Sequence, residues 1–352
     1  MTITITLPDG STRDFDGTPT GAEVAASIGA GLAKAALAVE VDGEVIDLVR
    51  PIDHDATVAI ITPNSEAGRE VLRHSTAHLM AQAVFDLFPG AKYAIGPAIA
   101  DGFYYDFLLE RPFTPDDLAQ IEATMAAIVA DDHTFKLDEY PFDEARAALV
   151  RFGQPLKIEI LDDLKAKSER DGTPLPPVTT YSHGQFQDLC RGPHVASTGK
   201  IGPFKLLSVA GAYWRGKSDQ PMLQRIYGTA WPTQEELDGF LWRREEMKKR
   251  DHRRLGVALD LFSFHDVSPG SAFWHPKGQL LWRTLEGAMR QLQDARGYRE
   301  ISTPIIVSKR LWEQSGHWEL YRENMFVIES EGEEFSLKRS EEHTSELQSH
   351  HD

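Results

Sequence analysis

The sequence predicts a multidomain α+β protein with a small β-rich domain at its start. Its 352 residues are two to three times the size of a usual domain, so the chain should fold around more than one core. Apolar and polar residues alternate over the first seven positions, which is typical of a strand. Farther along, helical segments and aromatic-rich, strand-like segments follow one another in an α+β pattern.

Composition narrows the class of protein further. With 37 basic and 54 acidic residues the formal net charge is −17, which argues against a chain that coats nucleic acid throughout but permits a local basic surface. A single cysteine excludes a disulfide scaffold and leaves a metal ligand or a reactive thiol in a reducing compartment. No apolar run reaches the roughly 18 residues of a membrane span, and the start lacks the pattern of a signal peptide. We therefore expect a cytoplasmic protein with no membrane partner.

Residues 1–62 show the element order of a β-grasp domain. An alternating strand, a turn at Asp9-Gly10 and a second strand form a hairpin. A helix over 20–30 follows, and then three strands over 36–41, 45–48 and 57–61. Ten acidic residues against three basic ones make this segment by itself a poor phosphate binder.

A second domain, residues 63–230, starts where Pro63-Asn64-Ser65 punctuates the chain. It has an α+β pattern, with a Pro-rich loop over 172–177. We expect a strand over 102–106 and helices over 66–88, 115–131 and 142–152.

A strongly helical segment from Thr233 to Leu255 lies within residues 231–255 and ends in the clearest basic stretch of the chain. These cations could follow a nucleic-acid backbone, or they could form a solvated helix face together with Glu245, Glu246 and Asp251. Both interpretations stay open. The candidate contacts are Arg243, Arg244, Lys248, Lys249 and Arg253.

Beyond residue 255 the chain mixes loops, helices and strands. We expect a helix over 279–296, a strand over 301–307 interrupted by Pro304, a helix around Leu311 and a strand near Phe335.

Two pairs of polar residues carry the most chemistry. His74 and His78 are four residues apart on a predicted helix, so both rings leave the same face. Cys190 and His194 repeat that spacing in a segment that Gly192-Pro193 keeps from being helical. One thiol and three imidazoles form a zinc ligand set in type and number, or a polar pocket that positions a water molecule. The alternative is two surface histidines and an unrelated buried cysteine, and spacing alone does not show whether the pairs meet.

The segment from Gly211 to Ser218 matches the phosphate-loop pattern G-x4-G-K-S literally. A phosphate loop must open a helix whose N-terminal amides hold the phosphates. Here Asp219-Gln220-Pro221 follows, and then residues 222–227 alternate like a strand. The context therefore argues against a nucleotide site.

In their order along the chain, these landmarks closely resemble bacterial threonyl-tRNA synthetases, which are class II aminoacyl-tRNA synthetases. The similarity extends from residue 1 to about 338. It is carried by His74-Ser-Thr-Ala-His78, Gly102-Phe-Tyr-Tyr-Asp106, Asp188-Leu-Cys-Arg-Gly-Pro-His194, Gly211-Ala-Tyr-Trp-Arg-Gly216, Gln224-Arg-Ile-Tyr-Gly-Thr-Ala-Trp231, Lys249-Arg-Asp-His-Arg253 and Leu311-Trp-Glu-Gln-Ser-Gly-His-Trp318.

The resemblance implies a TGS β-grasp domain over 1–62 and, over 63–230, an editing domain that hydrolyses seryl-tRNA(Thr). It also implies a basic linker helix over 231–255. The implied editing site contains His74, His78, Cys190, His194, Asp188, Lys157 and Tyr105. In this family the site is thought to work without a metal, whereas related alanyl-tRNA editing domains bind zinc with such a set, so the His/Cys group remains a candidate zinc site.

For residues 256–338 the resemblance implies the start of a class II antiparallel-sheet catalytic domain, whose motif 1 places Pro304 at a homodimer interface. The full-length family enzyme joins threonine to tRNA(Thr) with ATP, Mg²⁺ and Zn²⁺. After Lys338 the family pattern stops, and residues 339–352 resemble a translated sequencing adapter. We therefore expect a truncated ligase without an ATP site or the aminoacylation zinc ligands, which binds no cofactor and keeps editing and tRNA-contact parts. The alternatives are a free-standing seryl-tRNA(Thr) deacylase and a non-enzymatic TGS-type RNA-binding module.

Overall fold

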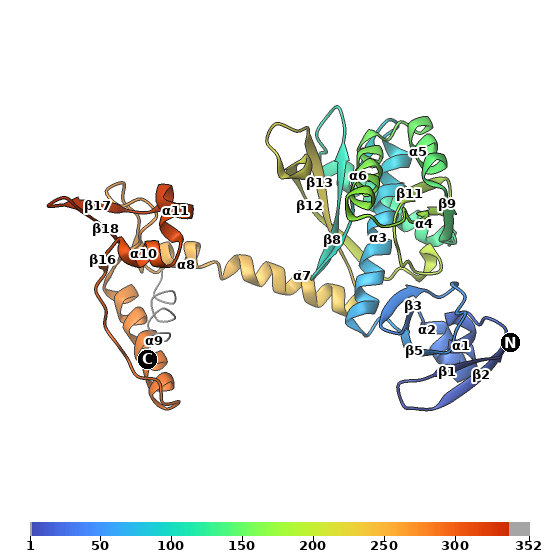
Figure 1. Ribbon diagram of the computed structural model, residues 1–352, viewed down its shortest axis with the longest axis horizontal. Helices are drawn as coiled ribbons and strands as arrows, with labels where there is room; N and C mark the ends of the chain where they lie inside the picture. The colour runs from blue at the N-terminus through green and yellow to red at the C-terminus, as the bar shows by residue number, and fades with distance from the viewer. Residues whose placement is uncertain (1, 338–352) are drawn as a thin grey trace. The chain divides into compact units, whose positions relative to one another are not determined.

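The computed structural model describes residues 2–337 (Figure 1). The chain divides into two compact units, of which the first ends at Lys249 and the second begins at Arg250. The predicted multidomain α+β class is confirmed. Residues 339–352, which resemble a translated adapter, lie outside the described residues.

The first unit starts with a five-stranded sheet in the order β2-β1-β5-β3-β4. β1 and β5 run parallel and the other neighbours antiparallel, and the apolar faces of the strands and of α1 enclose a core that includes Ile3, Ile5 and Val24. The hairpin turn at Asp9-Gly10 lies where the sequence predicts it, and Gly10 takes the left-handed φ of +81° that glycine accommodates. The elements are β1 Thr2–Thr6, β2 Thr12–Asp16, α1 Gly21–Ile28, α2 Ala30–Ala35, β3 Ala38–Val41, β4 Glu44–Asp47 and β5 Ala56–Ile61.

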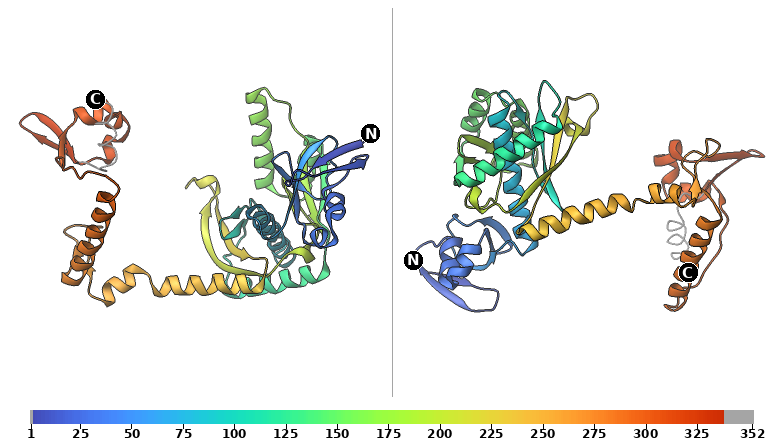
Figure 2. Two further views of the ribbon diagram at one scale, coloured as in Figure 1. Left: turned by 90° about the horizontal axis from the view of Figure 1, so that it is seen from below. Right: turned by 180° about the vertical axis from the view of Figure 1, so that it is seen from behind.

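A larger α+β region follows, built around the helix α3, Glu66–Leu87. Ser65 caps α3, because its hydroxyl accepts a hydrogen bond from the backbone N–H of Gly68 at 3.0 Å. α3 packs against β8, β13 and α4 and is buried along most of its length (Figure 2). The other elements are β6 Lys92–Tyr93, β7 Ala98–Ile99, β8 Gly102–Leu108, α4 Pro115–Asp131, β9 Lys136–Tyr140, α5 Phe142–Arg151, α6 Pro155–Asp171, β10 Val178–His183, β11 Phe186–Leu189, β12 Phe204–Tyr213 and β13 Met222–Ala230.

Two sheets organise this region. One has the order β12-β13-β8-β6, with β7 paired to β8, and the other has the order β11-β10-β9. The predicted helices over 66–88, 115–131 and 142–152 match α3, α4 and α5 to within one residue at each end. The helix α6 was not predicted, because its apolar residues recur too irregularly to mark one face.

The segment that matches the phosphate-loop pattern forms the end of a hairpin. β12 ends at Tyr213, a short 3-10 turn covers Trp214–Gly216, and β13 begins at Met222. No α-helix starts within it, so no row of free amides faces a phosphate. The structure thus confirms the strand predicted after this motif.

The long helix predicted from Thr233 to Leu255 is wrong in one respect, because it is interrupted. α7 covers Gln234–Lys249 and α8 covers His252–Ala258. Asp251 has a non-helical ψ of 120° and its carboxylate accepts from the backbone N–H of Arg253, so it caps a new helix. The sequence pattern alone did not reveal this N-cap inside a basic run.

The second unit contains a two-stranded sheet, β14-β15, and a three-stranded antiparallel sheet in the order β16-β18-β17. The strand predicted over 301–307 is wrong at its start, since β16 begins only at Ile306, after Pro304, which cannot donate to a ladder. The elements are β14 Phe262–Ser263, β15 Phe273–Trp274, α9 Pro276–Asp294, β16 Ile306–Ser308, α10 Arg310–Gln314, α11 His317–Tyr321, β17 Val327–Ser330 and β18 Glu333–Leu337.

Candidate active site

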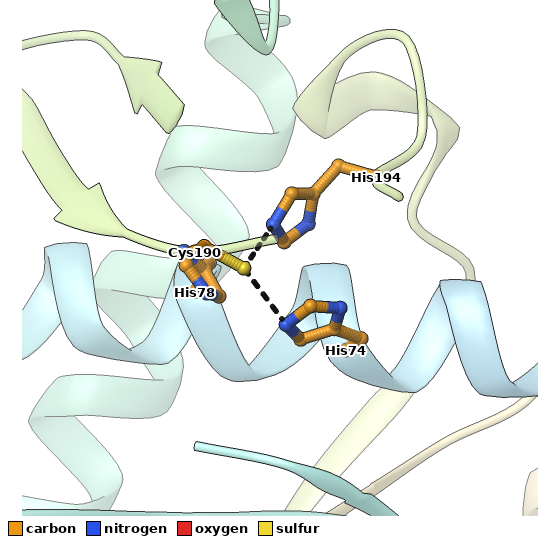
Figure 3. Close-up of side chains that lie close together, drawn as sticks. All are labelled: His74, His78, Cys190 and His194. Carbon is orange, nitrogen blue, oxygen red and sulfur yellow. Dashed lines mark hydrogen bonds between the residues drawn. The ribbon is translucent and has the colours of Figure 1, made fainter. Parts of the chain in front are cut away.

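The structure brings the two predicted pairs together. His74 and His78 leave one face of α3, and Cys190 and His194 come from the segment that follows β11 (Figure 3). Cys190 Sγ lies 3.3 Å from His74 Nε2 and 3.4 Å from His194 Nε2. One ligand atom from each of the four side chains lies within 4.8 Å of the others. The alternative of two surface histidines and an unrelated buried cysteine is therefore wrong.

Local packing fixes the orientation of His194. Its Nδ1 lies 3.1 Å from the hydroxyl of Ser75, which also accepts from the backbone N–H of Val195 at 3.0 Å. The ring stacks on Phe135, with centroids 4.9 Å apart, and meets Tyr181 edge to face at 4.5 Å. With Nδ1 next to Ser75 and one face stacked on Phe135, the imidazole presents Nε2 to Cys190.

A second group of polar residues lies beside these four side chains and includes all the other predicted site residues. Lys157 on α6 and Asp188 on β11 are both buried, and Lys157 Nζ is 2.6 Å from Asp188 Oδ1. The Tyr105 hydroxyl donates to Asp188 Oδ2 in a short hydrogen bond. His78 Nε2 lies 3.8 Å from the same carboxylate, which connects this group to the histidines. A buried charge requires such partners, so the carboxylate and the ammonium hold each other in place.

Burial keeps the His/Cys cluster, namely His74, His78, Cys190 and His194, uncharged at neutral pH. Desolvation lowers the pKa of His74 to about 4, and a smaller contribution comes from the nearby Lys157 cation. Desolvation also lowers the pKa of His78 and of His194, and the neighbouring imidazoles add to the effect. The same cause raises the pKa of the Cys190 thiol to about 12. The three imidazoles are therefore neutral at pH 7, with lone pairs free to accept a proton but with less basicity than a solvated histidine, while Cys190 is a thiol and a poor nucleophile.

The four side chains also match a tetrahedral zinc site in donor type. Bond lengths of about 2.3 Å to sulfur and about 2.0 Å to nitrogen place neighbouring donors about 3.5 Å apart. The two measured sulfur–nitrogen distances, 3.3 and 3.4 Å, agree with that spacing. His78 Nδ1 is buried and makes no hydrogen bond to the residues that the structure describes. His74, His78, Cys190 and His194 would therefore hold the ion if one binds.

A pocket of about 300 Å³ gives access to the cluster. His74 lines it together with Gly192 and Pro193, and Glu70 lies one helical turn before His74 on the same wall. His78 and His194 are 3% and 2% exposed, so they lie deeper. A small polar group that enters the pocket therefore meets His74 first.

Comparison with known proteins identifies the family. A model described as "Threonyl and Alanyl tRNA synthetase second additional domain" matches residues 178–227, and a TGS domain model matches residues 3–62. Proteins named threonine–tRNA ligase from Paraburkholderia phymatum, Burkholderia multivorans and Paraburkholderia xenovorans are each 51% identical over 336 residues, or 96% of this chain. The chain belongs to the threonyl-tRNA synthetase family.

The chain spans about half the length of the curated threonine–tRNA ligases it matches, namely 52% of each. A solved structure of the RNA binding domain of threonyl-tRNA synthetase from Cryptosporidium parvum Iowa II shares 42% identity over 29% of this chain and 26% of that one, with a TM-score of 0.28. Within the described part of this family member, no helix is both long and apolar enough to cross a membrane.

The remaining predicted contacts lie on other elements of the chain. Arg243, Arg244, Lys248 and Lys249 are on α7, whereas Arg253 is on α8 in the second unit. Three of the five pair with acids: Lys248 with Glu245 at 2.6 Å, Lys249 with Glu246 at 2.8 Å and Arg253 with Asp251 at 2.6 Å. Pro304 is exposed, in the segment before β16. The structure thus leaves both interpretations of the basic helix open.

Sequence reasoning missed several residues that shape the site. Ser75 lies inside the His74–His78 motif. A hydroxyl residue directly after one histidine of the pair was the signal that could have identified it. Tyr181 and Phe135 enclose His194 from distant strands and loops, with no signal of spacing. Asp47 comes from the β-grasp domain and accepts from the backbone N–H of His194 at 2.9 Å.

Proposed function

We propose that this chain carries the hydrolytic editing site of a threonine–tRNA ligase and acts on seryl-tRNA(Thr). In its full-length form the ligase joins threonine to tRNA(Thr) with ATP, Mg²⁺ and Zn²⁺. The observation that carries the proposal is the convergence of His74, His78, Cys190 and His194 beside the Lys157–Asp188 ion pair, with His74 lining a pocket. The curated relatives named threonine–tRNA ligase support the choice of substrate.

Selectivity gives a physical reason for such a site. Serine lacks only the methyl group of threonine, and one methyl group is worth about 1–3 kcal/mol of discrimination. A synthetic site alone therefore charges serine too often. A second pocket that admits serine and excludes the larger threonine removes the error by hydrolysis.

His74 is the proposed general base. Its lowered pKa, about 4, leaves the imidazole neutral at pH 7, and it lines the pocket. It accepts a proton from a water molecule as the water oxygen bonds to the ester carbonyl carbon. The ester C–O bond then breaks, and the ribose oxygen takes the proton back from the imidazolium. The products are free serine and tRNA with its terminal hydroxyl restored.

Lys157 is the proposed stabiliser of the negative charge that develops on the ester oxygen. Its ammonium group is buried, and Asp188 holds it at 2.6 Å while Tyr105 in turn holds Asp188. A positive charge fixed before the reaction stabilises an oxyanion without further reorganisation. Zn²⁺ held by these His and Cys side chains would instead polarise the attacking water, provided that one of the four left a coordination position to it.

The tRNA and dimer contacts complete the proposal. Arg243, which is exposed on α7 next to the exposed Trp242, together with Arg244, could contact the tRNA backbone. Lys248, Lys249 and Arg253 would have to exchange their acidic partners for phosphates. Pro304 and the exposed apolar face of α9 would form homodimer surface in the full-length ligase.

The test is single-turnover hydrolysis of seryl-tRNA(Thr) and of threonyl-tRNA(Thr) by the full chain, with and without a chelator. We expect serine-selective hydrolysis, and we expect His74→Ala to slow it by about 10²–10⁴-fold while tRNA binding persists. His54→Ala is the matched control, because His54 is an exposed histidine on the β-grasp domain that pairs with Asp42 and Asp53. Loss of activity on chelation would assign the chemistry to a metal.

Two results would contradict the proposal. A folded chain that binds tRNA but hydrolyses neither ester would favour an RNA-binding module. If His74→Ala and Cys190→Ala both keep full activity, the cluster is not the active site.

A further inference from the structure

A residue of the β-grasp domain reaches the candidate active site of the neighbouring domain. Asp47 is the last residue of β4 and is 6% exposed. Its Oδ1 accepts from the backbone N–H of His194 at 2.9 Å, and its Oδ2 accepts from the hydroxyl of Tyr181 in a short hydrogen bond. Both donors belong to the editing region, 134 and 147 residues farther along the chain.

The partners from its own domain are weaker. Arg50 Nε lies 3.9 Å from Asp47 Oδ2, and the same guanidinium is 3.6 Å from Glu139 on β9, across the domain boundary. A buried carboxylate is costly unless hydrogen bonds replace its water. The two donors of the other domain therefore offset most of the cost of burying the Asp47 carboxylate.

The two donors hold His194 from two sides. One is the backbone N–H of His194 itself, and the other is Tyr181, whose ring packs edge to face against the His194 imidazole. The chain between Cys190 and His194 also depends on Tyr181, because a Cβ at Gly192 would lie 2.1 Å from the Tyr181 hydroxyl. Moving Tyr181 therefore disturbs the loop as well as the ring.

We propose that Asp47 is a positioning residue, through which docking of the β-grasp domain sets the orientation of His194 in the candidate active site. The inference rests on the proposed editing function for its kinetic readout, and on geometry alone for its spectroscopic one. Asp47 does not touch the pocket and takes no part in the chemistry. It acts on His194 Nε2, which lies 3.4 Å from Cys190 Sγ.

The chemistry of the two donors favours a carboxylate at this position. A backbone N–H and a phenol each donate one hydrogen bond, and an aspartate accepts both with separate oxygens. An asparagine keeps one oxygen for the His194 N–H, and its amide can donate to a reversed Tyr181 hydroxyl. An alanine leaves both donors without a partner. The two substitutions therefore separate loss of charge from loss of position.

The kinetic experiment compares Asp47→Ala, Asp47→Asn and Glu139→Gln in the full chain. We expect Asp47→Ala to lower kcat for seryl-tRNA(Thr) hydrolysis by about 10-fold while KM changes less than about 2-fold. Asp47→Asn should recover most of that loss. Glu139→Gln removes the ion pair with Arg50 across the same boundary but leaves the Asp47 contacts, so its kcat should equal that of the parent chain.

A second readout follows His194 directly, by NMR of the full chain labelled with ¹⁵N-histidine. The His194 signals are assigned by their loss in His194→Gln. We expect the backbone amide and ring nitrogen shifts of His194 to move in Asp47→Ala and to stay unchanged in Glu139→Gln. If Asp47→Ala does not fold, Asp47→Asn gives the same test with a smaller shift.

The outcomes separate the two proposals. If the parent chain hydrolyses no ester, the proposed function fails, and the NMR shifts alone decide the role of Asp47. If Asp47→Ala keeps full kcat and unchanged His194 signals, the positioning role is overturned. If Glu139→Gln loses as much activity as Asp47→Ala, general docking of the domains explains the effect and Asp47 has no particular role.

Discussion

The two units differ in where their apolar side chains lie. In the first unit, α3 buries Leu79 and Met80 completely, and all the hydrophobic clusters of the described residues lie before Lys249. In the second unit, α9 carries a distinct apolar stripe, yet Leu285 and Met289 on it are 61% and 53% exposed. Apolar helix side chains therefore form a closed core in the first unit and an uncovered face in the second.

The difference matters for function because a catalytic constellation needs rigid support. The His/Cys cluster rests on a helix that is packed against β8, β13 and α4. An uncovered apolar face of this extent instead indicates an interaction surface. The first unit therefore has a closed core that can support a site, whereas the second leaves the apolar face of α9 exposed.

We expect the largest difference between the two units from a pair of matched Leu→Ala substitutions. Leu79→Ala should lower the free energy of unfolding of the first unit by about 2–5 kcal/mol, because it opens a cavity in a closed core. Leu285→Ala on α9 should cost about 0.5 kcal/mol or less, because the side chain is already exposed. Urea unfolding followed by circular dichroism measures both. Equal losses would mean that α9 is covered in solution.

A smaller effect is expected in the pH dependence of the stability of the first unit, where the buried histidines lie. Burial lowers the pKa of His74, His78, His183 and His194 below the ordinary 6.5, to about 3 for His183. Below pH 6.5 the unfolded chain binds protons that the folded unit does not, so stability falls as pH falls from 6.5 toward 4. Each histidine contributes up to about 1.4 kcal/mol per pH unit in that window.

The control for this dependence is His183→Gln, which keeps a donor for Gln82, the partner of His183 at 2.6 Å. The slope of the unfolding free energy against pH should then fall by up to about 1.4 kcal/mol per pH unit, which corresponds to one bound proton. An unchanged slope between pH 4 and 6.5 would show that His183 titrates normally in the folded unit.

The smallest expected effect concerns a helix cap of the first unit. Thr114 forms a capping box with Asp117 at the start of α4, and Arg111 holds the same carboxylate at 2.6 Å. Thr114→Ala should cost about 1 kcal/mol of unfolding free energy, whereas Thr114→Ser, which keeps the hydroxyl, should cost only a few tenths. If both variants unfold at the parent's urea midpoint, the cap is redundant with tertiary packing.

The local features of this protein follow from short stretches of its sequence. Alternation and a glycine turn predicted the first hairpin, and spacing of four on a helix placed His74 and His78 on one face. These features depend on residues close together in the chain, where backbone geometry leaves few choices. A resemblance carried by several motifs in order predicted the family, and with it Lys157 as a residue of the editing site.

How distant segments meet is visible only in the folded chain. It showed that the two His/Cys pairs converge, that α6 places Lys157 on Asp188, and that Asp47 reaches His194 from another domain. Each of these contacts joins residues separated by dozens of positions, and the packing of whole sheets and helices selects them. Because no local pattern encodes such packing, the geometry of the site depends on the fold while its ingredients can be found in the sequence.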